Sequence, residues 1–166
     1  MEDYNFLLQA FVEPILGNKI TYAKQLYHFG KICLGTKFRG VFMADQIPTD
    51  LNKLRKYAIV NLDPHTEEGI HWIAIAFMKP NKVLIYDSFG KMNAVPQQIL
   101  AIYPKSITTQ PDVEQKVSED NCGQRALAWL LVTECFGIHK AISIYDGVFF
   151  FGYCCVFSHF FFYSHC

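Results

Sequence analysis

Four side chains of the kinds used in nucleophilic catalysis occur in the order His71, Asp87, Gln115 and Cys122. A cysteine thiolate can attack a carbonyl carbon, an imidazole can take up and return a proton, and a carboxylate can orient the imidazole. An amide N–H can stabilise the oxyanion that forms during the attack. These four groups suffice for acyl transfer through a thiol, provided that the fold brings them together.

Cys122 is the strongest candidate for the nucleophile. It follows the polar segment 118–121 and takes the first position of a helix expected over 122–136, where apolar residues recur at helical spacing. Unpaired backbone N–H groups and the helix dipole at this end favour a thiolate. Cys33 and Cys135 lie in apolar segments and are interpreted as small core residues.

His71 and Asp87 belong to two strands joined by a tight turn. If residues 79–81 form a three-residue loop, Ile73 lies opposite Asp87, and Asp87 becomes a diagonal neighbour of His71 that its side chain can reach. A two-residue loop would shift the register and turn Asp87 to the other face. The alternative to an imidazole-orienting carboxylate is an ordinary polar contact at the strand ends.

Gln115 lies in a polar loop, seven positions before Cys122. From there its amide N–H could point at the space above the sulfur and, with the backbone N–H of Cys122, stabilise a tetrahedral intermediate. A glutamine in a loop is otherwise a solvated side chain, and only its companions favour the catalytic interpretation.

The elements that must position these residues are predicted from periodicity and turn signals. The pattern indicates an α+β domain over 1–147, with a small central mixed sheet flanked by helices. Helices are expected over 5–12 (ended by Pro14), 21–29 (ended by Gly30), 48–53, 95–103 and 122–136, and extended segments over 41–43, 57–62, 71–78, 82–87 and 106–109.

Charge and cysteine content restrict the class of protein. Fifteen Lys and Arg balance fifteen Asp and Glu, which argues against a general nucleic-acid binder, although a weak DNA contact remains an alternative. The six cysteines form no CxxC pair and no regular framework, as expected for a reducing compartment. The acidic start of the sequence does not resemble a signal peptide, so an intracellular location is expected.

Residues 148–166 differ in composition from the rest of the chain. They contain no Asp, Glu, Lys or Arg, but hold seven of the fifteen Phe residues. The favoured interpretation is an apolar segment packed on the domain, and its role in the active fold is open. The alternatives are a membrane anchor and a metal site built from Cys154, Cys155, His159, His165 and Cys166. No metal, cofactor or stable membrane partner is predicted.

Three motifs resemble those of the adenovirus-type maturation proteases, within the Ulp1-like cysteine protease superfamily. They are Gly69-Ile70-His71-Trp72, Tyr86-Asp87-Ser88-Phe89-Gly90, and Asn121-Cys122-Gly123 preceded at seven positions by Gln115. The resemblance covers about residues 30–137, and the motifs look most like those of polinton-like elements, adintoviruses and virophages. It implies a papain-like or Ulp1-like fold with the nucleophile at the start of a long helix.

The resemblance also implies the role of each residue. It makes His71 the general base, Asp87 its orienting carboxylate, Cys122 the nucleophile and Gln115 the oxyanion donor. Trp72 and Gly123 match positions at the substrate cleft, where a narrow passage favours glycine at the cleaved bond. The order of His71, Asp87, Gln115 and Cys122 along the chain is the same as in this family.

The implied function is a thiol endopeptidase that cleaves viral capsid or core precursor proteins at Gly-Gly-type sites, inside infected cells and virions. Adenovirus enzymes carry Glu where Asp87 stands, whereas Asp is common in SUMO-deconjugating relatives. The alternatives are therefore a deconjugase for ubiquitin-like modifiers and an inert, capsid-associated copy. The resembled adenovirus enzymes capture an activating peptide through a cysteine shortly before the glutamine loop. Residues 104–107 at this place contain no cysteine, so a disulfide-linked activating peptide is not expected.

Overall fold

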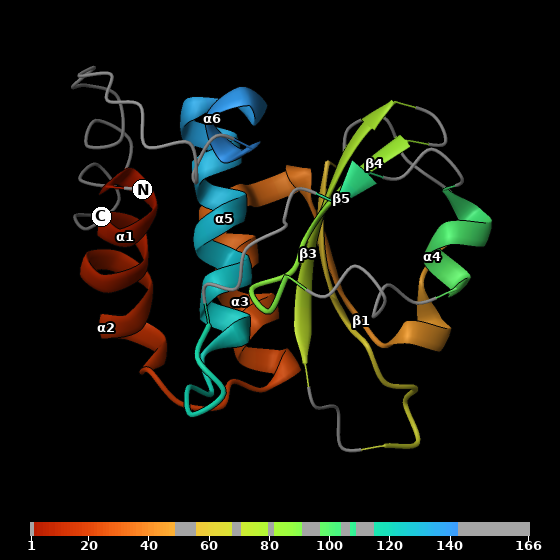
Figure 1. Cartoon of the computed structure of the whole chain (residues 1–166), viewed down its shortest axis with the longest axis horizontal. Coiled ribbons are helices and arrows are strands. Elements are labelled where there is room, and N and C mark those ends of the chain that lie inside the picture. Colours follow the sequence, from red (N-terminus) through yellow and green to blue (C-terminus); the bar gives the residue numbers. More distant parts are fainter. Residues whose placement is uncertain are drawn as a thin grey trace, which may run out of the picture.

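The chain folds into helices on both faces of a single sheet, as Figure 1 shows. The computed structural model describes residues 2–48, 56–67, 71–79, 82–90, 97–103, 107–108 and 115–142. One face is covered by α3 (Ala23–Leu34) and α5 (Cys122–Phe136), with the N-terminal helices outside them. The other face carries α4 (Gln97–Ile102). The predicted α+β class is confirmed.

Within the described residues, the sheet has five strands in the order β1-β2-β3-β4-β5. Its two outer pairings are parallel and its two inner pairings are antiparallel, so the predicted mixed sheet is confirmed. Four strands fall on segments that were predicted to be extended, with ends that differ by a few residues. The first strand shares only Val41 and Phe42 with the expected segment 41–43, because residues 38–40, which the sequence indicates as part of a loop, also belong to it. The bounds of the strands are Phe38–Phe42, Tyr57–Asn61, Trp72–Lys79, Lys82–Tyr86 and Ile107–Thr108.

The hairpin of β3 and β4 combines features of both loop lengths considered above. Four consecutive pairs, from Ala74↔Tyr86 to Phe77↔Val83, follow the register of a three-residue loop. The last pair, Lys79↔Lys82, belongs to a two-residue loop, and a bulge between Phe77 and Lys79 absorbs the difference. The register that sets Asp87 diagonally across from His71 is therefore confirmed.

Two helix ends were predicted wrongly. The N-terminal helix does not stop at Pro14: α1 (Glu2–Phe6) continues through a π-helical stretch (Leu7–Val12) into α2 (Glu13–Leu16). Pro14 lies in the first turn of α2, where its missing N–H costs little. The helix ends instead at Gly17, whose φ of 78° suits glycine.

Gly30 likewise does not end its helix. Helix α3 runs through it to Leu34 and stops at Gly35, which has a φ of 54°. A Cβ on Gly30 would lie 2.6 Å from Cζ of Phe38, at the start of β1. Glycine at this position therefore serves the close approach of the helix to the sheet rather than a turn.

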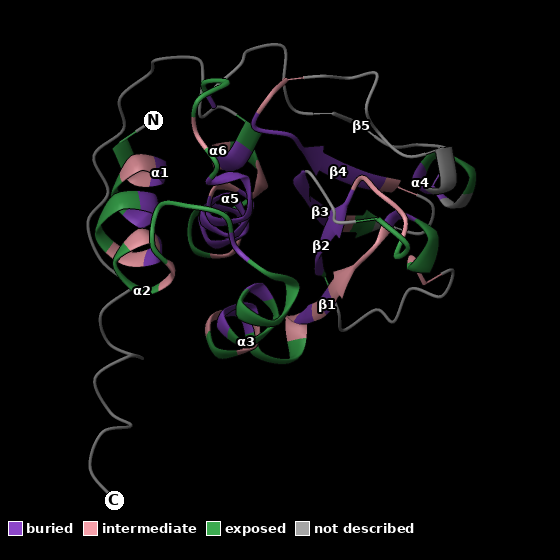
Figure 2. Ribbon diagram, turned by 90° about the horizontal axis from the view of Figure 1, so that it is seen from below, coloured by how far each residue is buried: buried purple, intermediate pink, exposed green. Residues whose placement is uncertain are grey.

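Two apolar cores lie on opposite faces of the sheet. The larger one joins β1–β4 to α3, α5 and the N-terminal helices, and Figure 2 shows α5 buried around most of its circumference. It includes Trp129, whose ring stacks on Tyr86 with centroids 5.4 Å apart. The smaller core joins Val60, Ile73 and Ile85 to Ile99 and Tyr103 around α4. Burial on both faces explains why β3 and β4 read as continuous apolar runs.

Several predictions lie outside the described residues. The helix expected over 48–53 falls mostly on residues 49–55, and the segment 148–166 falls entirely among residues 143–166. In the part of the chain that is described, no helix is long and apolar enough to cross a membrane.

We predict that Gly30→Ala destabilises the protein by about 1–3 kcal/mol, because the added methyl group must displace the Phe38 ring or separate α3 from β1. Urea-induced unfolding measures the loss. Ile32→Ala is the matched control, because Ile32 is 72% exposed on the same helix. Equal stability of Gly30→Ala and the wild type would contradict the close packing.

Candidate active site

His71 and Asp87 form a buried hydrogen-bonded pair at the ends of β3 and β4. His71 lies directly before β3 and Asp87 directly after β4, and His71 Nε2 lies 2.7 Å from Asp87 Oδ1. The same carboxylate oxygen accepts the backbone N–H of Phe89 at 2.9 Å, and the Phe89 ring packs on the imidazole with centroids 4.7 Å apart. The predicted contact is confirmed, and both partners have fixed orientations.

The second ring nitrogen of His71, Nδ1, takes no part in the contact with Asp87. Nδ1 is buried and has no hydrogen-bond partner of ordinary geometry among the described residues. Cys122 is nevertheless close enough to influence the protonation of the ring. An imidazole that binds a carboxylate through one nitrogen and has a thiol nearby can exchange a proton with the sulfur.

The charge balance of the pair favours the imidazolium. Burial alone would lower the pKa of His71, but interactions with Asp87 and Cys122 outweigh it and raise the pKa from 6.5 to about 9. At neutral pH the ring therefore carries a proton that it can give to a leaving group.

Cys122 occupies the first position of α5, as predicted. It is 7% exposed, and the backbone N–H groups of the first turn lie at its end of the helix. Burial raises the pKa of the Cys33 thiol to about 12. The pKa of the Cys135 thiol is also raised, first by partial burial and then by the negative charge of Glu134. Cys135 is exposed at the far end of α5 rather than in the core, which corrects the prediction for it.

Gly123 and Trp72 fix the position of this helix end. A Cβ on Gly123 would collide with Thr21 Oγ1 and lie 3.0 Å from Cδ2 of Leu26, so α5 approaches α3 as closely as glycine allows. The indole N–H of Trp72 donates to the Thr21 carbonyl at 3.1 Å. Both residues are thus buried in packing beside Cys122 and His71, and their contact with substrate stays a prediction.

Gln115 is 1% exposed, not solvated, and its side chain is held at both ends. Its Oε1 accepts the Ser88 hydroxyl at 2.7 Å, and its Nε2 donates to the Glu119 carbonyl. Its backbone N–H also donates to the Ser88 carbonyl at 3.0 Å. Burial and three hydrogen bonds separate this amide from an ordinary loop glutamine.

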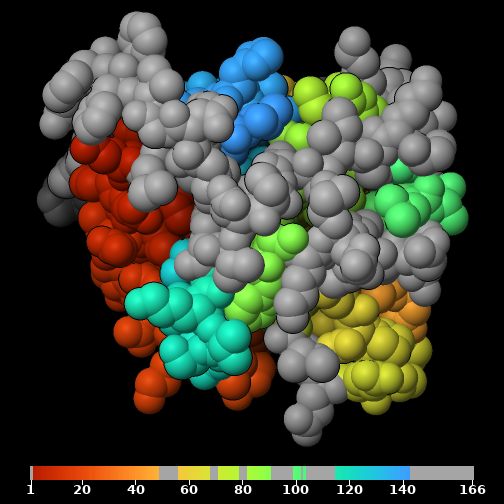
Figure 3. Space-filling model, in the orientation of Figure 1, coloured from red at the N-terminus to blue at the C-terminus, as the bar shows by residue number. Residues whose placement is uncertain are grey.

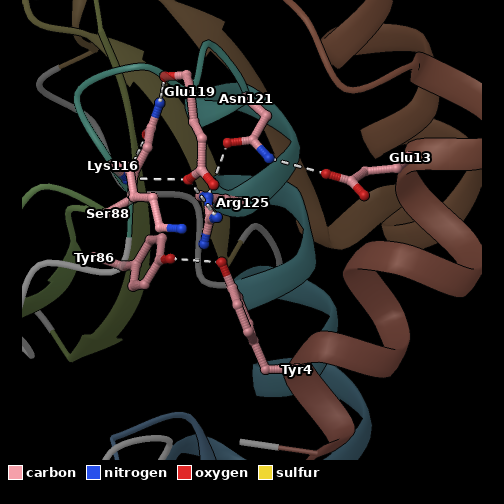
Figure 4. A network of polar contacts seen from close by, with 9 residues as sticks. Tyr4, Glu13, Tyr86, Ser88, Lys116, Glu119, Asn121 and Arg125 are labelled. Carbon is pink, nitrogen blue, oxygen red and sulfur yellow. Dashed lines mark hydrogen bonds and ion pairs between the residues drawn. The ribbon is translucent and has the colours of Figure 1, made fainter.

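A polar network connects the loop 115–121 to its surroundings (Figure 4). Arg125, on the first turn of α5, donates from Nε to Asn121 Oδ1 at 2.9 Å and from Nη2 to Glu119 Oε2 at 3.0 Å. Asn121 Nδ2 donates in turn to Glu13 on α2 at 2.9 Å. Figure 3 shows this loop, in cyan, on the surface beside the red N-terminal helices.

Sequence reasoning missed the supporting residues of the site. Ser88 and Phe89 stood inside a recognised motif, and their position next to Asp87 was a usable signal. Arg125 and Glu119 gave no signal of this kind, because exposed ion pairs six residues apart are common and seldom informative.

Other parts of the described structure do not compete with this site. A cavity of about 450 Å³ lies among Lys37, Lys56, Tyr57 and Glu134, at the C-terminal end of α5 and hence at the opposite end from Cys122. Three of its polar side chains pair with one another, since Glu134 accepts from both Lys37 and the Tyr57 hydroxyl. Among the described residues no group of three or more His, Cys, Asp or Glu could hold a metal ion.

We predict that the His71 ring titrates near pH 9, as followed by NMR of its ring carbons and nitrogens. Asp87→Asn and Cys122→Ala should each lower this pKa, because each removes an interaction that raises it. Since the folded-state pKa exceeds 6.5, the stability that His71 contributes is complete below about pH 6.5 and is lost as the pH rises through about 9.

Cys135→Ala is the control and should leave the titration of His71 unchanged. A wild-type value near 6.5 would show that the ring lacks the charge-stabilising contacts.

Comparison with known proteins agrees with this arrangement. The model of the adenovirus endoprotease family matches residues 38–118, from the start of β1 into the loop that precedes α5. The matched stretch contains His71, Asp87 and Gln115 and ends shortly before Cys122. No curated protein sequence matches the chain. Over this stretch, the chain is similar to the adenovirus endoproteases, which are a family of cysteine endopeptidases.

Proposed function

We propose that the chain is a thiol endopeptidase with Cys122 as nucleophile, His71 as general acid–base, Asp87 as orienting carboxylate and Gln115 as oxyanion donor. The observation that carries the proposal is the His71 ring, which binds Asp87 through Nε2, keeps Nδ1 buried without a hydrogen-bond partner among the described residues, and lies close enough to Cys122 for the thiol to raise its pKa. A buried nitrogen without a partner calls for an explanation, and a role in proton transfer supplies one here.

The reaction follows from these positions. The Cys122 sulfur attacks the peptide carbonyl carbon, and its proton resides on His71. The oxyanion is stabilised by the backbone N–H of Cys122 and the Gln115 amide. His71 then protonates the leaving amine nitrogen, the C–N bond breaks, and a thioester remains. Water attacks the thioester while His71 takes its proton, which releases the carboxylate product and restores the thiol.

The proposed substrates are capsid or core precursor proteins of a double-stranded DNA virus or an integrated element, cleaved at Gly-Gly-type sites in infected cells and virions. Support comes from the family match and from the motifs, which look most like polinton-like, adintovirus and virophage proteases. The helix-borne thiol and the histidine on a mixed sheet are consistent with a papain-like or Ulp1-like fold. Trp72 and Gly123 are proposed to restrict the cleft to glycine.

A second candidate is a deconjugase for ubiquitin-like modifiers. The feature that favours it is Asp87, which carries a shorter carboxylate than the glutamate usual in adenovirus enzymes. The two candidates share the chemistry of the site and differ in the partner: a flexible precursor segment or a folded modifier.

We predict that a Leu-x-Gly-Gly peptide with a vinyl-sulfone group labels Cys122 and no other cysteine, as detected by intact-mass and peptide-mass analysis. His71→Ala should slow labelling at neutral pH at least 100-fold, because the thiol loses the base that ionises it. Cys135→Ala is the matched control and should label at the wild-type rate. Full peptidase activity of Cys122→Ala would refute the assignment.

A second prediction separates the two candidate functions. The purified chain should cleave an unstructured peptide containing the Leu-x-Gly-Gly site and leave a folded SUMO-type precursor intact, as followed by gel electrophoresis and mass analysis. Processing of the folded modifier with rejection of the free peptide would favour the deconjugase.

A further inference from the structure

We propose that Ser88 and Arg125 are positioning residues that aim one N–H of Gln115 into the oxyanion site. The inference rests on the proposed function and adds to it the two residues through which Gln115 acts. Neither residue belongs to the catalytic set named above.

The hydrogen bonds determine the orientation of the Gln115 amide. The Glu119 backbone carbonyl can only accept, so the end of the amide that faces it must be Nε2. Oε1 therefore faces Ser88, and the Ser88 hydroxyl must act as the donor in the 2.7 Å contact. The flip of the amide is thus determined by chemistry rather than by the similar shapes of its two ends.

This orientation leaves one donor unused. The Nε2 group has two hydrogens, of which Glu119 accepts one, and no described residue accepts the other. Because Gln115 is 1% exposed, that hydrogen has little access to bulk water. A buried donor that is fixed in direction and lacks an acceptor is what a developing oxyanion requires.

Ser88 is suited to hold the oxygen end. It is fully buried, and its carbonyl also accepts the Gln115 backbone N–H at 3.0 Å, so side chain and backbone are joined at the same two residues. Ser88 directly follows Asp87, which orients His71. The end of β4 therefore positions both the acid–base group and the oxyanion donor.

Arg125 is suited to hold the nitrogen end. Its guanidinium binds the Glu119 carboxylate and the Asn121 side chain, and the Glu119 carboxylate also accepts the Lys116 backbone N–H at 3.0 Å. Burial would lower the pKa of Arg125, but Tyr4, Tyr86 and Glu119 raise it overall, so the guanidinium stays charged. Because Arg125 lies on the first turn of α5, its bond to the Glu119 carboxylate ties the residue whose carbonyl accepts from Gln115 to the helix that carries Cys122.

Ser88→Ala and Arg125→Lys test the proposal. In hydrolysis of the Gly-Gly peptide, Gln115→Ala should lower kcat by about 10²–10³-fold and Ser88→Ala by about tenfold or more, with KM nearly unchanged. Arg125→Lys should also lower kcat, because an ammonium cannot bridge Glu119 and Asn121 as a guanidinium does. Ser118→Ala is the matched control, since Ser118 is exposed in the same loop.

Two readouts separate positioning from general damage. Alkylation of Cys122 by iodoacetamide forms no oxyanion, so its rate should stay at the wild-type value in Ser88→Ala and Arg125→Lys. Adding Ser88→Ala to Gln115→Ala should cause no further loss of kcat, because Ser88 acts only through Gln115. The proposal would be overturned if the kcat losses of Ser88→Ala and Gln115→Ala multiply in the double variant. It would also be overturned if alkylation is slowed in both Ser88→Ala and Arg125→Lys.

A third readout does not depend on activity. Hydrogen exchange of the Gln115 side-chain amide, followed by NMR, should accelerate at least tenfold in Ser88→Ala and Arg125→Lys and stay unchanged in Ser118→Ala. If exchange accelerates in these variants but the wild-type chain neither hydrolyses the peptide nor reacts at Cys122, the proposed function is refuted, while the positioning of Gln115 by Ser88 and Arg125 is retained. If both variants have wild-type kcat and unchanged exchange of the Gln115 side-chain amide, only the positioning role of Ser88 and Arg125 is refuted.

Discussion

Backbone pairing between β3 and β4 sets the spacing on which the site depends. The register places Asp87 diagonally across from His71, and the 2.7 Å hydrogen bond between them follows from it. A shift of one residue would turn Asp87 to the opposite face and leave a buried imidazole without its carboxylate. The apolar cores on both faces of the sheet hold this register, so the burial of the strands and the protonation of His71 depend on the same pairing.

The sequence was sufficient to predict the elements that carry chemistry. Helix 122–136 was predicted with its observed ends, because a polar loop, a run of apolar residues at helical spacing and Gly137 define it locally. The His71–Asp87 contact was predicted for a three-residue loop, one of two loop lengths left open, and it forms because a bulge gives the body of the hairpin that register although the tip pair belongs to a two-residue loop. For the helix, a short stretch of sequence contained the information that was needed, whereas for the hairpin it left two registers open.

The remaining features depend on contacts between distant segments. In the sequence Gly30 indicates the end of a helix, but in the structure it allows the helix to pack against Phe38. Pro14 also indicates a helix end, but the helix continues through the π-helical stretch that precedes it. The environment of Gln115 could not be predicted either, because Ser88 is 27 residues away along the chain. Propensities describe the neighbours of a residue in sequence, whereas these outcomes were decided by neighbours in space.

The bulge near Met78 has a consequence for how the hairpin can change over evolution. Because it absorbs a one-residue difference between the tip and the body of the hairpin, the length of the tip is decoupled from the pairs closer to the site. Insertions or deletions at the tip can therefore be taken up locally, while Asp87 and Ser88 keep their places. The outer end of this hairpin is free to diversify, whereas its inner end must keep a strict residue count.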